Sequence, residues 1–292
     1  MDEVGYGNSY VDISLEARTL LKVLADKPAD HFVQEILIPH TRKVVHREIT
    51  LENAEEILSD PIHCLQAIYG CYAFSRRGKD RSELSQIALE ALDRTVREVT
   101  VDAFLSEPDG SRIWNNFSDV CKAHHHKVLE QLNMGVVAGM AELAQEIFEI
   151  DGVGSIFGWV AEGVRQTGRI EPQFLRMVDV RGIGPKLAST ILRDVVFLFK
   201  LEETLDHADR LYVQPVDKWL RLVFPFIVDE GLEDPADWIL AGKMAKYCRR
   251  SGVSGIRFNM GNSYFGMRDV REPERFESVI EALIAKNAAT LL

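Results

Sequence analysis

The chain has 292 residues, enough for one large domain or two ordinary ones, since a domain commonly takes about 150 residues. Hydrophobic residues make up 46% and charged residues 27%, a balance that excludes a disordered or fibrous chain. The formal net charge of −11 would repel a nucleic acid if it were spread evenly along the surface.

Apolar residues recur three and four positions apart along most of the chain, and strand-like alternation is rare, which predicts an all-α protein. In chain order, helices are expected at 15–24 with Ser14 as N-cap, and then at 51–58, 87–99, 120–132, 136–150 and 156–166, the last ending before Gly168. Turns are expected at 28–30, 60–61, 108–110, 151–152 and 233–235.

Residues 171–194 predict a helix-hairpin-helix. Phe174, Leu175 and Val178 give the first helix an apolar face, and the second has its own apolar face from Leu187 onward. Gly182 and Gly184 bracket an isoleucine that anchors the hairpin between the helices, and Pro185 suits the first position of the second helix. A helix start that faces outward is a phosphate site, so such a hairpin grips a DNA backbone without reading bases.

Lys186 lies in the first turn of that second helix, where the helix dipole disfavours a cation by roughly 0.3 to 1 kcal/mol. Two interpretations stay open. The lysine holds a phosphate, or the helix end and partial burial together keep part of the amine uncharged, so that it acts as a nucleophile near neutral pH.

Residues 182–188, GIGPKLA, resemble the G-V-G-x-K-x-A hairpin of the helix-hairpin-helix DNA glycosylases, the superfamily of endonuclease III and 8-oxoguanine glycosylase. Downstream, residues 213–217, VQPVD, resemble the proline-valine-aspartate signature of the same superfamily, and an amphipathic helix is expected at 218–224. The resemblance covers about residues 155–224 and implies a two-lobed helical glycosylase fold.

The resemblance also implies roles for two residues. Lys186 falls on the lysine of the bifunctional members, which attacks the sugar C1′ and forms a Schiff base, and Asp217 falls on the carboxylate found throughout the superfamily. The iron–sulfur cysteines of endonuclease III are missing, so no cluster and no other cofactor is expected. The spacing of 31 residues from Lys186 to Asp217 is long for the family and resembles its archaeal 8-oxoguanine branch, or else a loop insertion.

Asp217 has a second interpretation, because aspartate is an excellent N-cap and a helix is expected directly after it. The two roles are compatible. A capping carboxylate that also faces the cleft would offset the charge of an oxocarbenium-like sugar and help to deprotonate the attacking amine.

The segment 243–268 carries six bases and no acid. Arg249, Arg250 and Arg257 are candidates for DNA contacts, because basic side chains neutralise phosphates. The candidates for a base pocket are the aromatic residues Phe258, Tyr264 and Phe265. The alternative for this segment is an amphipathic helix followed by a glycine-rich loop with core aromatics.

Other signals are weaker. His124, His125 and His126 are adjacent and would point in different directions on a helix, so no metal site is expected. The four cysteines form no C-x-x-C pair and are expected to be reduced and partly buried. No apolar stretch reaches the ~18 residues that cross a bilayer, and the acidic, polar N-terminus does not resemble a secretory signal. We therefore expect no membrane contact and a cytoplasmic location, associated with the nucleoid in a prokaryote.

Together these observations predict a DNA repair glycosylase with abasic-site lyase activity, whose partner is double-stranded DNA with a damaged base, with 8-oxoguanine as the first candidate, or an abasic site. One lobe would comprise residues 1–90 and 225–292, and the other, with the hairpin, residues 91–224. The alternatives are a non-catalytic DNA-binding module and a monofunctional glycosylase.

Overall fold

The computed structural model describes residues 13–75, 80–107, 110–228, 231–232 and 234–288, and these residues form helices, turns and no strand. The prediction of an all-α protein is therefore confirmed for the described chain.

The chain divides into two compact units. Unit 1 comprises residues 1–29 and 216–292, and unit 2 comprises residues 30–215. The helices of unit 1 are α1 (Leu15–Ala25), α13 (Lys218–Val223), η5 (Phe224–Phe226), α14 (Asp237–Arg250), α15 (Gly255–Phe265), η6 (Gly266–Val270), η7 (Pro273–Arg275) and α16 (Phe276–Ala288).

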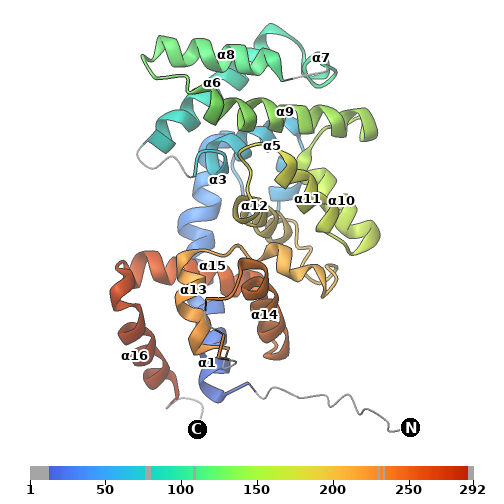
Figure 1. The fold of residues 1–292 in the computed structure, drawn as a ribbon. Coiled ribbons are helices and arrows are strands. Elements are labelled where there is room, and N and C mark those ends of the chain that lie inside the picture. Colours follow the sequence, from blue (N-terminus) through green and yellow to red (C-terminus); the bar gives the residue numbers. More distant parts are fainter. Residues whose placement is uncertain (1–12, 76–79, 108–109, 229–230, 233, 289–292) are drawn as a thin grey trace, which may run out of the picture. The chain divides into compact units, whose positions relative to one another are not determined.

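Unit 2 begins within α2 (Lys27–Phe32) and contains most of the helices (Figure 1). They are η1 (Val33–Leu37), α3 (Ile38–Val45), α4 (Ala54–Leu58), α5 (Pro61–Ala67), η2 (Ile68–Tyr72), α6 (Arg81–Glu98), α7 (Val101–Leu105), α8 (Ser111–Ala123), α9 (Glu130–Asp151), α10 (Ile156–Thr167), α11 (Glu171–Asp179), α12 (Pro185–Leu198) and η4 (Asp209–Val213). Helix α8 packs against both α6 and α9.

The two ends of the chain share a unit, as in the predicted lobes, but the boundaries differ from the predicted 1–90, 91–224 and 225–292. Residues 30–90 belong with the middle of the chain because their side chains pack there. The Tyr69 hydroxyl donates to the carbonyl of Val137 at 2.7 Å, and the ring of Phe74 stacks on that of Phe117. These contacts tie η2 and the residues after it to α8 and α9.

Helices with explicit end signals begin and end where the sequence predicts. Ser14 caps α1 by accepting from the Ala17 amide at 3.1 Å, and Gly168 ends α10 with φ +72°. The hairpin helices α11 and α12, and α13 after Asp217, are also confirmed.

Two predicted elements are wrong. The helix expected at 120–132 is interrupted, because α8 ends at Ala123 and α9 begins at Glu130. His125 and Leu129 have positive φ values of 56° and 46°, which no helix can continue through. The turn expected at 28–30 lies inside α2, where Pro28 occupies the first turn and loses no hydrogen bond.

Several predicted features lie outside the described residues: the N-terminal segment 1–12, the turn residues 108–109 and residue 233. The alternative of a glycine-rich loop after α14 is wrong, because residues 255–265 form α15.

Unit 1 has a close crossing of α1 and α15 at its centre. A Cβ atom on Gly261 would lie 1.7 Å from the carbonyl oxygen of Leu24, so only glycine fits there. Beside this crossing, the Trp219 indole of α13 packs beneath Gly266 and stacks on Phe276 of α16 with ring centroids 5.9 Å apart. These contacts fix α13, and with it the position of Asp217 within unit 1.

Candidate functional site

The hairpin between α11 and α12 forms as predicted. Gly182 has φ +99°, a conformation that L side chains rarely adopt, and the Ile183 amide donates to the carbonyl of Val180 at 2.9 Å. The Ile183 side chain is 2% exposed and anchors the turn in the core. Gly184 is the N-cap of α12 and Pro185 its first residue.

Helix α9 packs closely against the hairpin. A Cβ atom on Gly135 would lie 2.7 Å from the Arg181 side chain, and one on Gly139 would lie 2.9 Å from Val180. Two glycines one helical turn apart therefore let the hairpin backbone approach α9 closely. No local pattern in the sequence connects these glycines with the hairpin.

The hairpin leaves backbone donors at its outer edge. Within the described residues, no hydrogen bond takes the amide N–H of Gly182, Gly184 or Lys186. Gly184 supplies no side-chain cap, and Pro185 has no N–H. Unpaired amides combined with the positive end of the α12 dipole favour an anion such as a phosphate.

Lys186 is exposed at this edge, so it lacks the partial burial on which the nucleophile interpretation relied. No hydrogen bond or ion pair of the described chain engages its Nζ atom, and its carbonyl accepts from the Thr190 hydroxyl at 2.8 Å. The amine is thus accessible to a ligand at the hairpin. It also lacks an acidic partner that would offset the unfavourable dipole.

The spacing between Lys186 and Asp217 is long because the chain between α12 and Asp217 includes a segment that holds the start of α11, the first hairpin helix, in place. Asp209, 1% exposed, accepts from the amides of Ile170 and Glu171 at 2.7 and 2.9 Å, so it caps the start of α11 from a distance. The Arg169 guanidinium donates to the same carboxylate at 2.9 Å.

A second contact strengthens this brace. The Tyr212 hydroxyl donates to Glu171 at 2.6 Å, and burial, together with that hydrogen bond, raises the pKa of Tyr212 to about 12. The Tyr212 ring lies against that of Phe174 with centroids 4.7 Å apart. The segment therefore positions the hairpin. Only its acidity, and not this role, was visible in the sequence.

Asp217 is the N-cap of α13, as its second interpretation predicts. One carboxylate oxygen accepts from the Leu220 amide at 2.8 Å, and the other accepts from the Ser263 hydroxyl at 2.9 Å. The carboxylate is half-buried and held from two helices, α13 and α15. Asp217 belongs to unit 1 and Lys186 to unit 2.

The predicted DNA-contacting arginines separate into two kinds. Arg249 and Arg250 are exposed in the last turn of α14, where cations also suit the helix dipole. Arg257 instead donates to the carbonyls of Ala25 and Asp26 at 3.0 and 3.3 Å, at the end of α1. Arg257 therefore has a structural role within unit 1.

The predicted base-pocket aromatics are buried. Phe258 is 0% exposed, and Tyr264 and Phe265 are each 7% exposed, because all three lie on α15 within the packed interior of the structure. Phe265 packs edge-on against Phe276. The alternative of core aromatics accounts for Phe258, and none of the three presents a free ring face.

The histidine run does not lie on a helix, because α8 ends before it and His125 has positive φ. His124 pairs with Glu90 at 2.9 Å. In the described ranges no group of three or more His, Cys, Asp or Glu side chains is placed to hold a metal ion. No disulfide joins the four cysteines, all of which lie in the described part of the chain; Cys64, Cys121 and Cys248 are buried and Cys71 is partly buried.

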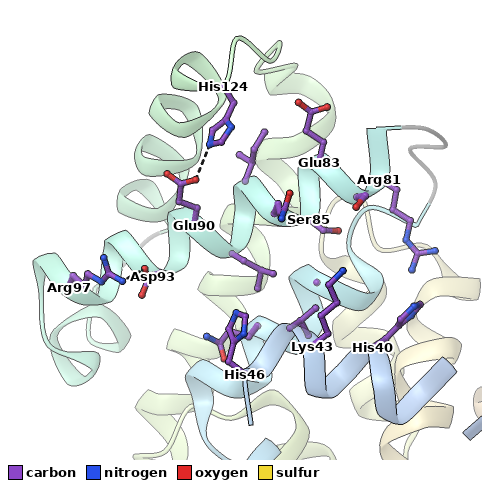
Figure 2. Close-up of a pocket in the computed structure, with 17 residues that line it drawn as sticks. His40, Lys43, His46, Arg81, Glu83, Ser85, Glu90, Asp93, Arg97 and His124 are labelled. Carbon is purple, nitrogen blue, oxygen red and sulfur yellow. Dashed lines mark hydrogen bonds and ion pairs between the residues drawn. The ribbon is translucent and has the colours of Figure 1, made fainter. Parts of the chain in front are cut away.

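A separate pocket in unit 2, with a volume of about 960 Å³, lies between α3, α5, η2 and α6 (Figure 2). None of the predicted site residues lines it. The pocket could not be predicted from the sequence, because its residues come from elements without a motif and only the fold brings them together.

No described helix of the structure is long and apolar enough to serve as a membrane span. Comparisons of the chain with protein-family models, with curated proteins and with solved structures found no match.

Proposed function

We propose that the protein is a DNA glycosylase with abasic-site lyase activity, in which Lys186 is the nucleophile. The observation that carries the proposal is the hairpin edge itself. An accessible lysine amine with no acidic partner stands beside three unengaged backbone amides at the positive end of α12. A phosphate held by these amides would bring the deoxyribose of a neighbouring nucleotide next to the amine.

The chemistry proceeds in three steps. The uncharged Lys186 amine attacks C1′, the bond from C1′ to the base breaks, and the base leaves with the bonding electrons and gains a proton. The nitrogen then loses a proton, the C1′–O4′ bond breaks as O4′ takes up a proton, and the nitrogen lone pair forms the C1′=N bond of a protonated Schiff base. Removal of a proton from C2′ then breaks the C3′–O bond, and the 3′ phosphate leaves.

The exposure of Lys186 sets a condition on the first step. Because the amine of the free protein lies in water, enclosure by the bound nucleotide has to favour its uncharged form. From the resemblance we propose that the Asp217 carboxylate, which α13 and α15 hold within unit 1, accepts its proton. The same carboxylate would offset positive charge on the sugar as the base leaves.

The decisive experiment is covalent trapping by borohydride, which reduces a Schiff base to a stable bond. The full chain is incubated with duplexes that contain 8-oxoguanine, other damaged bases or an abasic site. We expect a covalent product that Lys186→Gln abolishes, while DNA binding persists because the backbone amides remain.

Asp217 needs a pair of variants, because it is both a cap and the proposed proton acceptor. Asp217→Asn keeps a good N-cap and removes the charge, whereas Asp217→Ala removes both. We expect both variants to lose trapping, but only Asp217→Ala to lower the melting temperature. Full activity in Asp217→Asn would restrict Asp217 to its capping role.

The exposure of Lys186 also favours a second function, a DNA-binding module in which the lysine and the amides only hold a phosphate. Binding to duplex DNA without trapping on any substrate separates this function from the first. If base release occurs without trapping, the protein is a monofunctional glycosylase. In each case the partner is double-stranded DNA, which implies a cytoplasmic or nucleoid location.

A further inference from the structure

The pocket of unit 2 has an uneven charge distribution. Figure 2 shows His40 and Lys43 on α3, with Arg81 at the start of α6, on one side of the pocket. The acids Asp93 and Glu90 lie at the other end, and each is already paired, with Arg97 at 2.6 Å and with His124 at 2.9 Å.

The cationic side has no such pairing. In the described part of the chain no ion pair engages His40, Lys43 or Arg81. The acid Glu83 also lines the pocket, but in Figure 2 its side chain points away from Lys43. Positive charge therefore accumulates on this wall without a carboxylate to balance it.

Arg81 is fixed in this arrangement by the backbone. Its guanidinium donates to the carbonyl of Cys71 at 2.7 Å, at the end of the π-helix η2. One nitrogen is used there, which leaves other N–H groups of the planar fork to bind an oxyanion. A guanidinium held in place loses less entropy when it binds a ligand.

The electrostatics of His40 agree with this description. Loss of solvent around the ring, followed by the charges of Arg81 and Lys43, lowers the pKa of His40. The two cations therefore act on the same point in the pocket, and an anion there would relieve their repulsion.

We infer that this pocket binds a small phosphomonoester, with its phosphate between His40, Lys43 and Arg81. The volume of about 960 Å³ lies at the upper end of the range of small-molecule sites. Gln66, Ser82, Ser85 and Gln86 line the rest with neutral polar groups, and the Oε1 atom of Gln66 is buried with no hydrogen-bond donor in the described chain. A ligand body with hydroxyl or amino groups would supply that donor.

A compact ligand fits better than a nucleic-acid strand. A strand that continued past the phosphate would meet Glu90 and Asp93 at the far end of the pocket, and like charges repel. The inference is thus independent of the proposed DNA function, and its residues are different from those at the hairpin.

The test is calorimetric titration of the full chain with deoxyadenosine monophosphate, and with inorganic phosphate, in a chloride buffer. We expect saturable binding of both, and no binding of free deoxyadenosine. Lys43→Gln should weaken binding of the monophosphate about tenfold, since a charge-assisted contact is lost. Lys43 is exposed, so this variant should keep its fold, which thermal unfolding checks.

The matched control is Arg97→Gln, which changes a pocket-lining arginine already paired with Asp93 and should alter the affinity far less. Absence of saturation at millimolar phosphate would overturn the inference, as would equal binding by Lys43→Gln. A single-stranded oligonucleotide that binds more tightly than the monophosphate, with a loss in Lys43→Gln, would also overturn it, because the site would then belong to a nucleic-acid surface.

Discussion

Lys186 shows how one side chain can depart from local helix preference. A cation in the first turn of α12 costs about 0.3 to 1 kcal/mol, and nothing in the described residues compensates it. Burial does not explain the residue either, because the side chain is exposed. An anionic ligand is the remaining partner that would make a lysine favourable there, and this supports a functional role over a structural one.

Arg193 and Asp194 present the opposite case, a pair of charges inside the core of unit 2. Both residues are 3% exposed, their side chains pair at 2.7 Å, and the Tyr72 hydroxyl donates to Asp194 at 3.0 Å. The Arg193 guanidinium also lies over the ring of Phe32 at 5.0 Å. Burial raises the pKa of Asp194, against the opposing effect of Arg193.

Asp194→Ala should destabilise the protein by roughly 3 to 5 kcal/mol, because it leaves a buried guanidinium without its carboxylate. Urea unfolding followed by circular dichroism measures the change. The control is Asp93→Ala, which removes an exposed partner of Arg97 and should cost less than about 1 kcal/mol. Equal losses in the free energy of unfolding for the two variants would show that the buried pair contributes no more to stability than the exposed pair.

At the scale of elements, the crossing of α1 and α15 depends on one glycine. Gly261→Ala would place Cβ 1.7 Å from the Leu24 carbonyl, so the helices must separate, and we expect a loss of about 3 kcal/mol. Gly242→Ala in α14 is the matched control, since no atom lies within 4 Å of its Cβ position. That variant should be stabilised by up to about 1 kcal/mol. Thermal unfolding of both variants tests the difference.

The basic end of α14 makes a further prediction about an element. If Arg249 and Arg250 contact DNA phosphates, the double variant Arg249→Glu with Arg250→Glu should reduce the slope of log affinity against log salt by about 2. Arg257→Gln should leave the slope unchanged and lower stability, because its guanidinium binds the carbonyls that end α1. An unchanged slope in the double variant would remove this helix end from the interface.

Elements could be predicted from sequence where a residue type enforces an end. Ser14, Gly168, Pro185 and Asp217 each mark a helix boundary that the structure contains, because capping and proline geometry are local. The break between α8 and α9 was missed, since His125 and Leu129 adopt positive φ without any glycine to announce it.

The functional residues also divide into those that a local pattern predicts and those that only the fold brings together. The hairpin could be predicted from the sequence because its glycines and proline lie next to one another in the chain. The brace by Asp209 and the pocket around Arg81 depend on contacts between residues far apart in the chain, and no local pattern encodes them. The aromatic run of α15 was misjudged because composition does not distinguish a stacking platform from a packed core.

At the scale of the whole molecule, unit 2 is a single stretch of chain, whereas unit 1 is assembled from both ends. The hairpin lies within residues 30–215, together with the α9 glycines that pack against it and Asp209, which caps the start of α11. Asp217 and the exposed arginines of α14 lie outside. The phosphate-binding amides and the proposed nucleophile Lys186 therefore lie in unit 2, whereas the proposed proton acceptor Asp217 lies in unit 1.

A fragment of residues 27–215, which keeps α2 whole, should fold alone, because it contains continuous chain and its own apolar core. We expect helical circular dichroism and one cooperative unfolding transition. The fragment should bind duplex DNA weakly through the hairpin but give no borohydride trapping, since it lacks the carboxylate of Asp217.

Addition of Gly182→Ala should then abolish its DNA binding, because alanine is strained at φ +99°. A fragment that is trapped as efficiently as the full chain would show that Lys186 needs no group from unit 1, and the role assigned to Asp217 would fail.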